Sequence, residues 1–123
     1  MSVQIYALKK NFAVQKAERF FKERRVPAQA VDLKKHKLGL REVQLFARAA
    51  GGAANLVDRD SVSARSHPIC HTDNEQVILD YLLEKPEFLR TPIVRDGQHV
   101  VIGEDPAGWQ RLAEGANEQK RQA

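Results

Sequence analysis

The chain has 123 residues, of which 42% are hydrophobic and 29% charged, a composition typical of a globular domain that buries its own core. The net charge of +4 is spread along the sequence, whereas nucleic-acid-binding proteins usually gather basic residues on one element, so direct nucleic-acid binding is not expected. A single cysteine excludes an internal disulfide. With no export signal and no apolar run long enough to cross a bilayer, we expect a cytoplasmic protein without a membrane partner.

The first third of the sequence predicts a β-α-β unit. Residues 3–6 are typical of a strand, and apolar residues between 13 and 21 recur at the spacing of an amphipathic helix. Asn11 is placed to cap this helix through its side-chain oxygen, and Val26-Pro27 ends it. Residues 28–33 alternate with a period of two and predict a second strand, parallel to the first.

The rest of the chain predicts helices followed by a hairpin. Apolar stripes over residues 40–47 and 77–82 indicate two helices, separated by a turn-rich stretch. Residues 92–103, with a turn at Asp96-Gly97, give a strong hairpin signal. Asp105 and Pro106 start a short final helix that runs through Leu112.

These elements together predict an α/β fold of the thioredoxin-like class. The expected order is β-α-β, a helical insertion at about residues 39–90, and then β-β-α, with a mixed four-stranded sheet. We expect a single domain over residues 1–114. Residues 115–123 are polar and are expected to form a flexible tail.

Three segments resemble the arsenate reductase-like family, which includes glutaredoxin-coupled arsenate reductases and the RNA-polymerase-binding regulator Spx. Residues 9–24 are similar to its active-site turn and first helix, and residues 31–34 to its second strand. Residues 88–97 closely resemble its signature LLRTPIVRNG. The resemblance covers residues 3–112 and implies the thioredoxin-like fold.

The resemblance also implies a site whose key residue has changed. In this family the residue that matches Asn11 is a nucleophilic cysteine that attacks arsenate. Arg90 matches an arginine that holds the oxyanion near the thiolate, and Pro92 matches a proline commonly held in cis. Because asparagine is neutral and a poor nucleophile, ordinary arsenate reduction is not expected at this position. Ala7 and Glu104 also depart from the family pattern, which often has glycine and an aromatic residue there.

An anion pocket can outlast the lost thiol chemistry. The backbone N–H groups that follow Asn11 and nearby basic side chains would attract arsenate, phosphate or a glutathione carboxylate. For Arg90 the alternative is a salt bridge to the helical insertion. No cofactor is expected, although glutathione can act as cosubstrate or ligand. The predicted anion site consists of Lys9, Lys10, Asn11, Phe12, Arg90 and Pro92.

The one thiol of the chain, Cys70, lies between two histidines in the segment His67–His71. Structural zinc sites usually need four ligands with defined spacing, and a fourth is missing from the immediate neighbourhood. We therefore predict no metal site and interpret Cys70 as a loop cysteine beside exposed histidines. A metal site and a relocated redox thiol are the alternatives.

The sequence leads to a main functional hypothesis and two alternatives. The main one is a catalytically silent binding or regulatory protein that keeps a weak anion pocket. The first alternative is a thiol-dependent oxidoreductase of the arsenate reductase type, using glutathione or Cys70. The second is a regulator that binds a protein partner, as Spx does.

Overall fold

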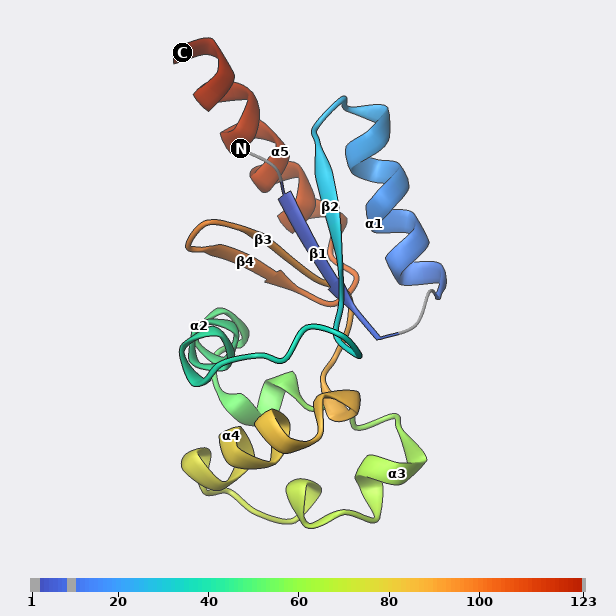
Figure 1. The fold of residues 1–123 in the computed structure, drawn as a ribbon, viewed down its shortest axis with the longest axis vertical. Helices are drawn as coiled ribbons and strands as arrows, with labels where there is room; N and C mark the ends of the chain where they lie inside the picture. The colour runs from blue at the N-terminus through green and yellow to red at the C-terminus, as the bar shows by residue number, and fades with distance from the viewer. Residues whose placement is uncertain (1–2, 9–10, 123) are drawn as a thin grey trace. The chain divides into compact units, whose positions relative to one another are not determined.

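The computed structural model describes residues 3–8 and 11–122, without the side chains of residues 116–122. The chain divides into two compact units (Figure 1). The sheet unit consists of residues 1–32 and 91–123, and the helical unit of residues 33–90.

The sheet unit contains four strands, which are β1 (Val3–Ala7), β2 (Ala28–Asp32), β3 (Ile93–Asp96) and β4 (His99–Ile102). Their order across the sheet is β2-β1-β3-β4. Strand β1 pairs in parallel with β2 and antiparallel with β3, which pairs antiparallel with β4. This arrangement confirms the predicted mixed four-stranded sheet and its α/β class.

Two helices of the sheet unit, α1 (Phe12–Glu23) and α5 (Pro106–Gln122), pack on the same face of the sheet. The buried residues of α1 are Val14, Ala17 and Phe21, which lie within the amphipathic stretch predicted over residues 13–21. The two helices are also joined at the surface. The guanidinium of Arg24 lies 3.5 Å from the ring centroid of Phe20, and its Nε donates to Gln110 at 3.1 Å. The shared core consists of Val3, Ile5, Ala17, Phe21, Val26, Val94, Trp109, Leu112 and Ala113.

Helix α5 begins as the sequence predicts but extends further. Asp105 accepts the N–H of Gly108 at 3.1 Å and so caps the first turn. A Cβ on Gly108 would lie 2.8 Å from Val101, so glycine lets α5 approach β4 closely. The helix continues to Gln122 rather than ending near Leu112, because the good helix formers Ala, Glu, Gln, Lys and Arg dominate its second half. The flexibility of residues 115–123 stays a prediction.

The helical unit has its own buried core. Gly51, with a φ of 83°, ends helix α2 (Leu40–Ala50) in the left-handed conformation that glycine adopts without strain. Helix α3 (Val62–Arg65) and the 3₁₀ turn η2 (Pro68–Cys70) lie in the predicted turn-rich stretch. Ser61 and His67 cap these two short segments through their side chains. Phe46, Leu56, Ile78 and Leu82 are buried. The elements are α2 (Leu40–Ala50), η1 (Ala53–Leu56), α3 (Val62–Arg65), η2 (Pro68–Cys70), α4 (Glu75–Glu84) and η3 (Pro86–Phe88).

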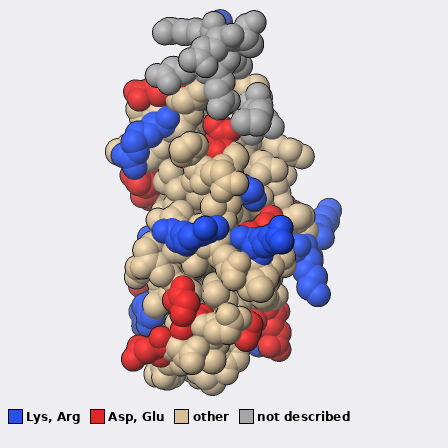
Figure 2. Space-filling model, turned by 90° about the vertical axis from the view of Figure 1, so that its left-hand side faces the viewer, with Lys and Arg blue, Asp and Glu red and all other residues tan. Residues whose placement is uncertain are grey.

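The charged side chains do not form one large basic area in the view of Figure 2, where Lys and Arg are interspersed with Asp and Glu. Within the described residues, no helix combines the length and the apolar character needed to span a membrane.

Candidate functional site

The turn between β1 and α1 holds the position where the resemblance implies a catalytic thiol. Asn11 has an extended backbone, and its Oδ1 accepts the N–H of Val14 at 2.9 Å. Its backbone carbonyl accepts the N–H of Gln15, also at 2.9 Å. These bonds confirm that Asn11 is the N-cap of α1. The side chain therefore satisfies one of the free donors of the helix end, and it offers no nucleophile.

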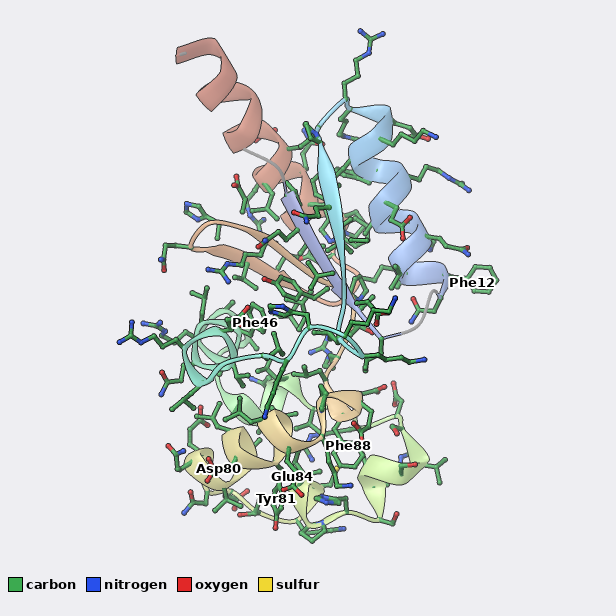
Figure 3. All side chains as sticks on the ribbon, viewed as in Figure 1. Phe12, Phe46, Asp80, Tyr81, Glu84 and Phe88 are labelled. Atoms are coloured by element: carbon green, nitrogen blue, oxygen red, sulfur yellow. The ribbon has the colours of Figure 1, made fainter. Side chains whose placement is uncertain are left out.

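The first turn of α1 carries no acidic residue, and its first residue is exposed whereas Val14 is buried. Phe12 is 84% exposed, and Figure 3 shows its ring pointing away from the strands. The positive end of the helix dipole is therefore not compensated by a carboxylate from its own first turn. Lys9 and Lys10, predicted as neighbours of this turn, lie outside the described residues.

Pro92 lies at the same end of the sheet as this turn. Tyr6 near the end of β1 pairs with Ile93 at the start of β3, so the chain leaves β1 toward Asn11 where it enters β3 from Pro92. The Thr91–Pro92 peptide bond is cis, as the resemblance implies. The carbonyl of Pro92 accepts the N–H of Gly103 at 2.8 Å.

Arg90 belongs to the helical unit, and its interactions there differ from the salt bridge considered for it. Its Nη1 donates to the carbonyl of Asn55 at 3.0 Å, and its backbone N–H donates to Leu56 at 2.7 Å. Since Asn11 and Pro92 belong to the sheet unit, a single anion site that joins all three residues stays a prediction.

The side of the helical unit that contains Arg90 also has a polar cavity of about 280 Å³. Arg59, which lines this cavity together with Arg90, could not be selected from any motif in the sequence. The lining also contains two carboxylates, those of Asp58 and Asp60. The full lining is Ala54, Asn55, Val57, Asp58, Arg59, Asp60 and Arg90.

The segment around Cys70 has structural partners. His67 Nδ1 accepts the N–H of Ile69 at 3.1 Å, and its ring packs 4.8 Å from those of Tyr81 and Phe88. These two aromatic residues are labelled in Figure 3. His71 Nε2 lies 2.9 Å from the carbonyl oxygen of Arg65. Over residues 3–8 and 11–122, no group of three or more His, Cys, Asp or Glu residues is arranged to hold a metal ion.

Comparison with known proteins finds similarity in structure alone. No protein-family model matches the chain, and no curated protein matches it in sequence. The arsenate reductase from Vibrio cholerae superposes with a TM-score of 0.79 at 14% identity, covering 91% of this chain and 98% of that chain. An ArsC family related protein from Bacteroides fragilis gives 0.77 at 15% identity, covering 91% and 98%. An arsenate reductase (ArsC) related protein from Brucella melitensis gives 0.69 at 20% identity, covering 90% and 93%. The chain therefore has the fold of the arsenate reductase-like proteins.

Proposed function

We propose that this protein is a catalytically silent relative of the arsenate reductases that acts by binding. The observation that carries the proposal is the hydrogen bond of 2.9 Å from the Val14 N–H to Asn11 Oδ1. A side chain that caps the helix without charge stands where the resemblance places a thiolate, and a thiolate is the nucleophile that arsenate reduction needs. The only cysteine, Cys70, lies in the helical unit.

The proposed binding role has two components. The N-terminus of α1 has no acidic residue in its first turn and favours a weakly held oxyanion or the carboxylate of glutathione. The family resemblance gives Arg90 the role of holding an oxyanion through charge-assisted hydrogen bonds. The exposed ring of Phe12 favours a protein partner at the same turn, because aromatic side chains supply much of the binding free energy at protein interfaces. Such a protein would be regulatory, in the manner of Spx, and a reducing cytoplasm suits its single thiol.

The catalytic half of the proposal is tested by an arsenate reduction assay coupled to glutathione and glutaredoxin. We expect no turnover above the rate without protein. The variant Asn11→Cys, assayed beside it, reports whether the surrounding site supports chemistry once a nucleophile is restored. Turnover by the unaltered chain would refute the silent role.

The binding half is tested by NMR titration with arsenate, phosphate and glutathione. We expect amide shifts at Asn11 to Ala13, where the N–H groups of the α1 terminus lie. The N-terminus of α4 at Asn74 is the matched control, because it has the same asparagine cap but an acidic first turn. Equal shifts at both termini, or none at Asn11 to Ala13, would contradict a specific anion site.

A further inference from the structure

The sheet unit has a cavity of about 210 Å³ between the carboxyl ends of β1 and β2 and the first turns of α1. In open α/β sheets, ligands commonly bind at the carboxyl ends of parallel strands. This cavity shares no residue with the predicted anion site. Its lining consists of Ile5, Ala7, Leu8, Val14, Glu18, Ala30, Val31 and Asp32.

The lining has a definite chemical character. Among the described residues, the lining is apolar except for Glu18 and Asp32, so its charged side chains within that part of the chain are both carboxylates. Both residues also interact with other groups of the chain, and each carboxylate offers about four acceptor positions. The cavity therefore disfavours anions and suits a group with an aliphatic stem and a cationic end. Lys and Arg side chains have this form.

A partner segment that pairs with the edge of β2 could place such a side chain in the cavity. Strand β2 is an edge strand of the sheet, and Ala28, Gln29 and Ala30 are exposed. Native edge strands are usually protected by charges, prolines or bulges; here Pro27 precedes β2 and Asp32 ends it, but the four residues between them contain neither a charge nor a proline. An extended segment can pair with such an edge through main-chain hydrogen bonds. Residues 30–32 belong both to this edge and to the cavity, so alternate side chains of an added strand would face the cavity.

We propose that the edge of β2 binds an extended segment of a protein partner and that the cavity receives one Lys or Arg side chain of that segment. The main-chain pairing supplies affinity that depends little on sequence, and the cavity supplies the selectivity. Because the whole chain carries a net charge of +4, long-range attraction does not favour a basic partner. Recognition therefore depends on the local contacts with Glu18 and Asp32.

The test is an NMR titration of the full chain with a short acetylated and amidated peptide of alternating valine and threonine that has one central lysine. We expect shifts of the amides of Val14, Glu18 and Ala30. The same peptide with norleucine, which keeps the stem but lacks the charge, should bind about tenfold more weakly, equivalent to about 1.4 kcal/mol. Equal affinity for both peptides, or no binding of the lysine peptide, would overturn the proposal.

Variants locate the binding site. Glu18→Gln should weaken the lysine peptide about tenfold, and Ala30→Leu should block it by filling the cavity from an exposed position. Glu23→Gln is the matched control, because Glu23 is exposed on the same helix and does not line the cavity. Circular dichroism confirms that each variant is folded. Binding that is insensitive to both cavity variants, or equally sensitive to the control, rules this site out.

Discussion

Helices α1 and α4 both begin on an asparagine whose Oδ1 accepts an N–H three residues later, at 2.9 Å from Val14 and 3.2 Å from Val77. Their surroundings differ. The first turn of α4 contains Glu75, whose carboxylate oxygens accept the N–H of Ala53 at 3.0 and 3.2 Å. The first turn of α1 has no acid and exposes Phe12. The same cap thus leaves one helix end tied into its own unit and the other available to a ligand.

The largest expected effect tests whether α1 and α4 belong to separately stabilised units. Phe21→Ala in the sheet unit removes a side chain with 0% exposure and should lower the free energy of unfolding by about 3–5 kcal/mol. Leu82→Ala, also at 0% exposure in the helical unit, should cost about 2–5 kcal/mol. Urea denaturation measures both costs, and hydrogen exchange shows where each acts. Each variant should accelerate exchange mainly in its own unit, and uniform acceleration would contradict the division.

The next effect concerns the carboxylate that distinguishes α4. Glu75→Ala leaves the N–H of Ala53, a residue with 0% exposure, without this acceptor, and should destabilise by about 1–3 kcal/mol. Glu84→Ala, at the exposed end of the same helix, should change stability by less than about 0.5 kcal/mol. If the two variants are equally stable in urea, Glu75 does not tie α4 to its surroundings.

The two asparagine caps should contribute similar free energies to the stability of the fold. Asn11→Ala and Asn74→Ala each remove one side-chain acceptor from a helix end and should each cost about 1 kcal/mol. Thermal denaturation of the two variants against the unaltered chain measures this. A near-zero cost at Asn11 alone would mean that its hydrogen bond to Val14 does not stabilise the fold, and its role as a stabilising N-cap would be wrong.

The smallest effect is a difference between two introduced thiols. In a Cys70→Ser background, Asn11→Cys places a thiol at a helix end without an acid, whereas Asn74→Cys places one beside Glu75. We expect the lower thiol pKa in the Asn11→Cys variant, because a neighbouring negative charge disfavours the thiolate. Iodoacetamide reaction rates followed against pH give both values. A lower pKa in the Asn74→Cys variant would reverse the comparison.

Local signals predicted much of the fold. The cap at Asn11, the turn at Asp96-Gly97 and the start of α5 at Asp105 depend on residues close in sequence, so composition and spacing were sufficient. The hydrogen bond between Glu75 and Ala53 joins residues 22 positions apart. That Arg59 and Arg90 line the same cavity depends on how the helical unit folds. Neither leaves a periodic pattern. The cavity beside Glu18 likewise arises from three elements and has no local signature.

The position of β1 between β2 and β3 has a consequence for the order in which this chain folds. Strand β1 can pair with β2 once the short crossover through α1 is made. Its other neighbour, β3, begins only at Ile93, much later in the sequence. The helical unit is contiguous in sequence, so most of it can form on the ribosome before β3 emerges. Until then, the edge of β1 that pairs with β3 stays unpaired in the first β-α-β segment. Closing the long intervening loop has an entropic cost that grows only slowly with its length, so a helical unit that folds early and shortens the effective loop would lower this cost only modestly.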